Sequence, residues 1–323
     1  MIALLLGGCT EKGLPESLAN GRQSVVLQTD WFPQPEHGGF YQALANGFYE
    51  EEGLQVTILP GGPNAMSTQK VLSGRAHFAM NRADTIYSLA TRDVPVTMVM
   101  ATLQHDPQAI LLHANNAINS LAELDGQSVM AIPGLTWIDW VEAKYGIKLD
   151  IIPHDFGMER FLQDPEFIQQ CLLTNEPFYA GEAGFATKVL RLSDAGFDPY
   201  HGIYGLQSLV ETDPDLVERF VRASIRGWRD FILGDPRPAL DLIRERNPRM
   251  TEAFVAFSYA ALQAHHLVTG SALNGSMVGQ LDPERLNNMI TDMEALGLAD
   301  PHNRPLSWFT ARFTQVTLEQ PKD

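Results

Sequence analysis

Apolar residues along the chain recur with two periods, and segments of the two kinds alternate. Short runs rich in Val, Ile and Leu end at Gly, Pro, Asn or Asp, as strands do. Stretches whose apolar residues stand three and four positions apart follow them, as in amphipathic helices. The first part of the chain is predicted to form strands at 25–29, 56–59, 77–80 and 94–101 and helices at 37–45, 48–52, 64–72 and 84–90. Strands that alternate with helices are typical of βαβ units, so we expect an α/β fold with a mainly parallel sheet.

The alternation starts again near residue 115 and gives way to helices after residue 212. The second set of elements consists of strands at 128–132, 149–152, 168–173 and 188–192 and helices at 137–145, 159–162 and 176–183. The final part is predicted to form helices at 213–234, 236–246, 251–268 and 283–296. Because it has too few strands to form a domain by itself, we expect it to pack on the first unit.

These elements predict two lobes, which agrees with a length of 323 residues. The first lobe would consist of residues 24–112 plus 200–312, with a tail at 313–323. The second lobe, residues 113–199, would be inserted into the first. An insertion of this kind requires two crossings of the chain, which we expect near 110–115 and 195–205.

Charge and composition exclude several classes of function. The chain has 23 Lys and Arg against 39 Asp and Glu, a net charge of −16, which repels nucleic-acid backbones and anionic lipid surfaces. It contains no glycine-rich phosphate loop, no nucleophile elbow and no His-Glu-x-x-His motif, so we expect neither catalysis, nor a cofactor, nor a metal. The two cysteines cannot form a disulfide scaffold, and Cys171, in an apolar strand, is interpreted as an inert core thiol.

The first residues favour a lipid anchor. A short apolar run ends in Leu6-Gly7-Gly8-Cys9, which resembles the lipobox of bacterial lipoproteins, where the cysteine is acylated. The run is short and no basic residue precedes it, so we expect the true start to lie upstream and the signal to be truncated. Residues 10–23 would then be a tether. The alternative is an ordinary cytosolic terminus with an incidental cysteine.

The most informative stretch follows the first predicted strand. Trp31 and His37 stand on the loop that leaves this strand, and ligands of open α/β sheets bind at the carboxyl ends of strands. The flat face of Trp31 suits stacking on a ring. Its alternative role is a hydrophobic plug beneath the loop.

Three runs carry a resemblance to a known family: Trp-Phe-Pro-x-Pro-x-His-x-Gly at 31–39, Gly-Phe-Tyr-x-x-x-Gly-Leu-x-Val at 47–56, and Pro-Gly-Gly-Pro at 60–63. Further matches stand at 78–80, 104–107, 121–126 and 174–177. Together they resemble the substrate-binding proteins of ABC importers that bind thiamine pyrimidine precursors, sulfonates, taurine or nitrate. The resemblance, over 24–270, implies a two-lobe type II periplasmic-binding-protein fold with a two-strand hinge. It also implies a monomer outside the cytoplasm, held by its lipid anchor beside a permease and an ATPase.

The family pattern indicates ligand-binding residues in both lobes. In the first lobe it points to Trp31 as stacking platform, His37 as its polar neighbour, Gly62 and the helix start at Asn64 as sources of backbone N–H groups, and Asn81, Asp84 and Gln104 as hydrogen-bonding side chains. Asn81 and Asp84 have the alternative role of helix caps.

In the second lobe the pattern points to Trp137 and Glu176. Trp137 has the alternative role of a core residue, packed with Trp140 or Val141. Glu176 has that of a helix N-terminal carboxylate, which the helix dipole favours.

The residue types favour one ligand class. A carboxylate such as Glu176 accepts hydrogen bonds from an aminopyrimidine edge and repels a sulfonate, and Arg82 is the only cation near the predicted loops. We therefore expect a neutral or cationic heteroaromatic ligand, such as a thiamine pyrimidine precursor. Sulfonate, taurine, nitrate or riboflavin remain alternatives.

Two other functions are weighed against binding for import. The superfamily includes pyrimidine synthases, but these carry a lysine and a histidine where this chain has Asn81 and Thr85, and a cysteine-rich run that is absent here. An enzyme is therefore not expected. A sensory ligand-binding domain is a third possibility.

Overall fold

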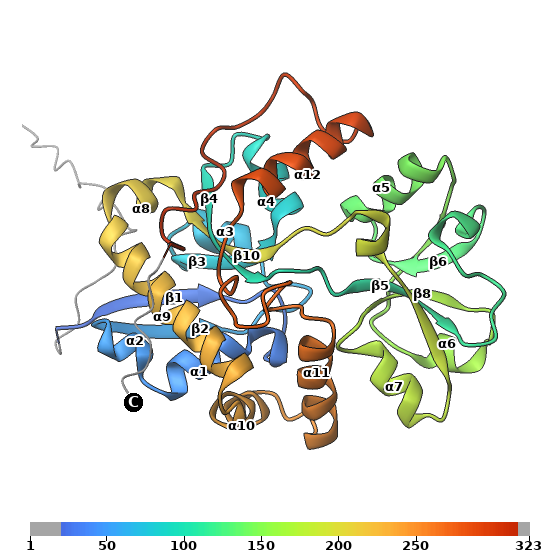
Figure 1. Ribbon diagram of the computed structural model, residues 1–323, viewed down its shortest axis with the longest axis horizontal. Coiled ribbons are helices and arrows are strands. Elements are labelled where there is room, and N and C mark those ends of the chain that lie inside the picture. Colours follow the sequence, from blue (N-terminus) through green and yellow to red (C-terminus); the bar gives the residue numbers. More distant parts are fainter. Residues whose placement is uncertain (1–20, 316–323) are drawn as a thin grey trace, which may run out of the picture.

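Two five-stranded sheets lie side by side and are joined by two crossings of the chain (Figure 1). The structure, a computed structural model, describes residues 21–315. The first sheet has the order β2-β1-β3-β10-β4 and contains β1 (Gln23–Gln28), β2 (Leu54–Leu59), β3 (Phe78–Arg82), β4 (Val96–Leu103) and β10 (His201–Leu206). The second has the order β7-β6-β8-β5-β9 and contains β5 (Gln108–His113), β6 (Ser128–Ala131), β7 (Asp150–Pro153), β8 (Ile168–Leu172) and β9 (Thr187–Arg191).

We call residues 21–103 and 201–315, built on the first sheet, the first lobe, and residues 108–195, built on the second sheet, the second lobe. The helices of the first lobe are η1 (Pro35–His37), α1 (Gly38–Ala45), α2 (Phe48–Glu51), α3 (Ser67–Leu72), α4 (Ala83–Ala90), α8 (Gln207–Thr212), α9 (Pro214–Leu233), α10 (Arg237–Arg246), α11 (Glu252–Ala264) and α12 (Pro283–Ala295). Those of the second lobe are η2 (Leu121–Leu124), α5 (Thr136–Tyr145), α6 (Glu159–Gln163), α7 (Glu176–Glu182) and η3 (Leu192–Ala195). The predicted limits of the inserted lobe, at 112/113 and 199/200, stay a prediction. Strand β5 begins before the first of these limits and pairs entirely within the second sheet.

The predicted α/β class is confirmed, and each sheet is mixed in a simple way. In the first sheet only β10 runs against its neighbours β3 and β4, and in the second only β5 runs against β8 and β9. Neither strand was predicted. β5 is buried at every position and so lacks the alternation of a half-exposed strand, while β10 contains two glycines, which lower strand propensity.

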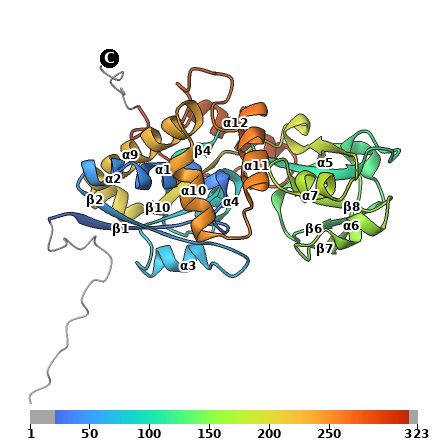
Figure 2. The ribbon, with the colours of Figure 1, turned by 90° about the horizontal axis from the view of Figure 1, so that it is seen from below.

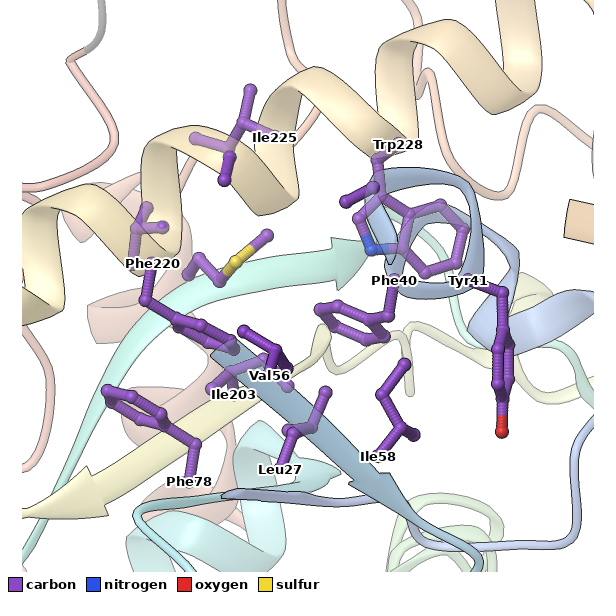
Figure 3. Packing of buried hydrophobic residues seen from close by; sticks show 14 of the residues in the cluster. Leu27, Phe40, Tyr41, Val56, Ile58, Phe78, Ile203, Phe220, Ile225 and Trp228 are labelled. Carbon is purple, nitrogen blue, oxygen red and sulfur yellow. The ribbon is translucent and has the colours of Figure 1, made fainter. Parts of the chain in front are cut away.

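The C-terminal helices pack on the first sheet. Figure 3 shows Phe220, Ile225 and Trp228 of α9 above the apolar face of β1 and β2, with Phe40 of α1 between them. Gly39 permits this close approach, because a Cβ there would lie 2.1 Å from Cγ of Trp228. Figure 2 shows α11 at the junction of the lobes, on the side where the second lobe carries α7.

Cys9 and the end of the predicted tail lie outside the described residues. Within the described part, no helix is both long enough and apolar enough to cross a bilayer.

Candidate functional site

A cavity of about 200 Å³ lies between the two lobes. From the first lobe it is lined by residues that follow β1 or end β3, and from the second by residues that follow β7 or end β8. These are carboxyl ends of strands, the edge at which open α/β sheets bind ligands. Of the predicted site residues, Trp31, Asn81 and Glu176 line this cavity.

The ring of Trp31 faces the second lobe. It is half-buried, and its centroid lies 5.3 Å from that of Phe156 across the interlobe space and 5.6 Å from that of Phe32 on its own loop. Trp31 is therefore not a plug beneath its loop, because its ring borders the cavity and meets an aromatic ring from the opposite lobe.

Two carboxyl groups from opposite lobes line the cavity. Glu36 is buried; its Oε1 accepts a hydrogen bond from the hydroxyl of Thr174, and its Oε2 has no partner among residues 21–315. Burial raises the pKa of Glu36. For Glu176, burial and the nearby charge of Glu36 outweigh the hydrogen bond from the Leu172 N–H (2.7 Å) and raise the pKa to about 7. Burial thus raises the pKa of both carboxyl groups, and that of Glu176 comes close to neutral pH.

A third carboxylate, Asp30, is held by His37. His37 Nε2 lies 2.8 Å from Asp30 Oδ1. Burial opposes the charge of Asp30, but the hydrogen bond and charge of His37 outweigh it and lower the pKa of Asp30 to about 2. His37 is itself buried and does not line the cavity, so the prediction that it neighbours the ligand is wrong. Its ring is held instead by the hydrogen bond to Asp30, at the end of the buried η1.

Arg82 lines the cavity with its charge already paired. Its Nε lies 3.2 Å from Oδ1 of the buried Asp84, whose Oδ2 has no hydrogen-bond partner among the described residues. Burial opposes these charges, yet their attraction holds the pKa of Asp84 low and that of Arg82 high. Asp84 is not at the cavity, which corrects its predicted contact with ligand.

Two further predicted ligand contacts, by Gln104 and by the Gly62 N–H, are corrected because both groups form hydrogen bonds within the protein. Gln104 donates from Nε2 to the carbonyl oxygens of Met277 (2.8 Å) and Gln280 (3.0 Å), so it ties the C-terminal segment to the crossing. The Gly62 N–H is not free, because it donates to the Asp30 carbonyl at 3.1 Å.

The start of α3 and the position of Trp137 also differ from the ligand-binding interpretation. α3 starts at Ser67, after Met66 in the left-handed region (φ 51°), and not at Asn64. Trp137 lies on the buried face of α5 with 0% exposure, in the core cluster that contains Val141. It therefore takes the core alternative.

Comparison with known proteins assigns the family. Residues 34–239, more than half of the chain, match the model of the family described as NMT1/THI5 like. The chain belongs to the NMT1/THI5-like family. The resemblance inferred from the sequence motifs is thereby confirmed.

Relatives of this NMT1/THI5-like protein include binding proteins and enzymes. It is 28% identical to riboflavin-binding protein RibY of Chloroflexus aurantiacus over 68% of its own length and 65% of that protein, slightly under two thirds of the relative. It is 23% identical to the formylaminopyrimidine-binding protein of Halalkalibacterium halodurans, over 68% and 70%. It is 21% identical to a protein of Legionella pneumophila named 4-amino-5-hydroxymethyl-2-methylpyrimidine phosphate synthase, over 72% and 77%.

Solved structures agree on the fold. The aliphatic sulphonate binding protein SsuA of Escherichia coli, a periplasmic protein, superposes with a TM-score of 0.64 at 12% identity, over 87% of this chain and 91% of that one. The NMT1/THI5-like chain thus has the fold of a periplasmic binding protein, with a cavity between its lobes.

The cavity of this family member contains several residues that the motifs did not indicate. They are Glu36, Gln108, His154, Phe156 and His201. Gln108 and His201 are the first residues of β5 and β10, the strands that were missed, so finding those strands would have pointed to them. Glu36 stands inside the Pro-x-His motif, at the position for which the motif specifies no residue. Phe156 follows β7 as Trp31 follows β1, and an aromatic residue after a strand is a pattern that could have indicated this residue.

Proposed function

We propose that this protein is the extracytoplasmic substrate-binding component of an ABC importer and binds a small heteroaromatic ligand in the cavity between its lobes. A thiamine pyrimidine precursor is the leading class. The observation that carries the proposal is a set of buried acceptor atoms without partners in the described chain, Oε2 of Glu36 and Oε1 of Gln108, in the cavity that Trp31 borders.

Buried acceptors of this kind favour a ligand that donates hydrogen bonds. A buried polar atom without a partner costs about 1–3 kcal/mol, and a ligand N–H would remove that cost. Glu36 and Glu176 approach the cavity from opposite lobes, so a single ligand with several N–H groups would bond to both lobes at once. An aminopyrimidine presents such donors on the edge of a flat ring, which Trp31 could stack.

Charge supports a neutral or cationic ligand over an anion. Asp30, Glu36 and Glu176 line the cavity, and the guanidinium of Arg82 is paired with Asp84. A sulfonate or nitrate would meet carboxylates without a free cation to compensate, which costs binding energy. The likeness to sulfonate-binding proteins concerns the fold alone.

Contacts between the lobes support binding by hinge closure. Thr174 of the second lobe donates its hydroxyl to Glu36, and its carbonyl accepts a hydrogen bond from Ser258 of α11 at 2.6 Å. A ligand held by both lobes would stabilise this closed arrangement by its higher affinity for it. Our proposal includes a lipid anchor at Cys9, a monomeric binding protein, and a permease and an ATPase as partners, which the lipobox-like motif and the family support.

The test is a binding titration with five probes on the purified protein. We expect 4-amino-5-hydroxymethyl-2-methylpyrimidine, a formylaminopyrimidine or riboflavin to bind, and taurine and nitrate not to bind. Trp31→Ala and Glu176→Ala should each weaken binding by about tenfold or more, or about 1.4 kcal/mol. Glu182→Ala, an exposed glutamate on the same helix as Glu176, should leave the affinity unchanged.

Three outcomes would contradict the proposal. Binding of taurine or nitrate alone would overturn the ligand class, and unchanged affinity in both Trp31→Ala and Glu176→Ala would overturn the site. Because some relatives are named as synthases, the purified protein should also be assayed for formation of the phosphorylated pyrimidine. Turnover there would replace the transport role with an enzymatic one.

A further inference from the structure

Phe156 combines a strained backbone with an uncovered aromatic ring. Its φ of 61° lies in the left-handed region, where bulky residues are rare, and its side chain is 51% exposed. Its N–H donates to Nδ1 of His154 at 2.8 Å, and the Gly157 N–H donates to Oδ1 of Asp155 at 2.9 Å, so the loop is held by its own side chains. Such strain costs about 1–3 kcal/mol and is found mostly at ligand clamps and switch regions.

The ring of Phe156 stands where two hollows meet. Beyond the cavity of about 200 Å³ lies an outer groove of about 740 Å³, and both Trp31 and Phe156 line both of them. The Phe156 ring is tilted by 37° to that of Trp31, with centroids 5.3 Å apart, and its other neighbour is the ring of His154 at 5.1 Å. The Trp31–Phe156 pair therefore lies at the boundary between the cavity and the outer groove.

We propose that Phe156 is a ligand-binding residue, and that the flat ring of the ligand enters between Trp31 and Phe156. This inference rests on the proposed function, and it names the second aromatic wall of the same site. A ligand ring in this position would place its donor edge toward Glu36 and Glu176.

The distance between the rings of Trp31 and Phe156 determines how far they must separate to admit a ligand ring. Two rings that each contact one face of a ligand ring at about 3.5 Å stand about 7 Å apart. The rings of Trp31 and Phe156 are closer than that, so the Phe156 ring must withdraw by about 2 Å into the groove. Half of the Phe156 side chain already faces water, so its ring can move without leaving a packed core.

Two aromatic walls would make the site selective for flat rings. A planar heterocycle gains contact on both faces, whereas a tetrahedral sulfonate or a flexible amine gains it on neither. Phe156 would thus determine specificity for the ring, while the carboxyl groups recognise its edge.

The experiment compares Phe156 with a matched phenylalanine. Phe32 also contacts Trp31, at 5.6 Å, and is 41% exposed, but it lines only the outer groove. Binding of 4-amino-5-hydroxymethyl-2-methylpyrimidine and of riboflavin is titrated to wild type, Phe156→Ala, Phe156→Tyr and Phe32→Ala, with dissociation rates from stopped flow. Phe156→Ala should raise Kd by about tenfold, mainly through faster dissociation, whereas Phe156→Tyr and Phe32→Ala should stay within about threefold. Thermal unfolding of each variant verifies that it folds.

The outcomes separate this inference from the proposed function. If Trp31→Ala and Glu176→Ala weaken binding but Phe156→Ala does not, the binding site stands and the role of Phe156 is overturned. An equal loss in Phe32→Ala and Phe156→Ala would also overturn it, because general apolar surface would then explain both. If wild type binds neither probe, the proposed ligand class fails, and the inference about Phe156 fails with it.

Discussion

Replacing Glu176 by glutamine should change how stability depends on pH. The folded protein raises the pKa of Glu176 from its ordinary 4.5 to about 7, chiefly through burial. Between these two values the folded state holds a proton that the unfolded state has released. The free energy of unfolding therefore falls as pH rises through this interval. The stability that the bound proton contributes is fully present only below pH 4.5. Glutamine does not titrate and removes this loss.

The size of the effect follows from the shift. One pKa unit corresponds to 1.36 kcal/mol, so the full interval corresponds to about 3 kcal/mol. Glu176 is half-buried and reaches the cavity, where water screens its charge, so we expect about 1–2 kcal/mol. Relative to wild type, Glu176→Gln should thus gain about 1–2 kcal/mol in stability between pH 5 and pH 8.

Urea unfolding at pH 5 and pH 8 measures this difference. The self-repulsion of the net charge of −16 is common to both proteins and largely cancels in the comparison. Glu182→Gln, on the exposed side of the same helix, should show no such pH-dependent gain. If the stability difference between Glu176→Gln and wild type is the same at both pH values, or if the variant loses stability toward pH 8, the reasoning is refuted.

Three other changes test the packing and the buried charges. Gly39→Ala should destabilise the protein by about 1–3 kcal/mol in urea unfolding, because the new Cβ would lie 2.1 Å from Cγ of the buried Trp228. Gly181→Ala, within α7 and with no atom near its Cβ position, should instead raise the free energy of unfolding by about 0.4–1 kcal/mol; a lowered thermal midpoint would contradict this. Asp84→Ala should cost about 3–5 kcal/mol in denaturant unfolding, since it leaves the buried Arg82 unpaired, and a loss under 1 kcal/mol would show that water reaches the pair.

Local patterns were enough to predict much of the fold. The helix from Pro214 to Leu233 follows directly from apolar residues three and four positions apart, and Asp213 caps it by accepting the Leu216 N–H at 3.1 Å. The strands of the parallel part could be predicted because most of these apolar runs end at Gly, Pro, Asn or Asp. β5 and β10 were missed because burial on both faces, or glycine within the strand, removes the local signal.

The site could be predicted only in part. Trp31, Asn81 and Glu176 line the cavity, and each of them follows or ends a strand. Their place at the carboxyl edge of a sheet can therefore be inferred from the sequence. His37, Asp84 and Gln104 stand in equally suggestive places, yet each already has a hydrogen-bond partner within the protein, nearby in the chain for the first two and distant for Gln104.

The sequence by itself determined the family, the α/β class and the position of Trp31 at the end of the first strand. Each of these depends on residues close together in the chain, whose spacing directly reflects burial on one face or a turn. Only the tertiary structure decided which side chains face the cavity. Gln104 is occupied by carbonyls more than 170 residues away, and Glu36 meets Thr174 across the lobes. Whether a polar side chain is free for a ligand depends on partners that chain crossings bring together, and no local pattern records them.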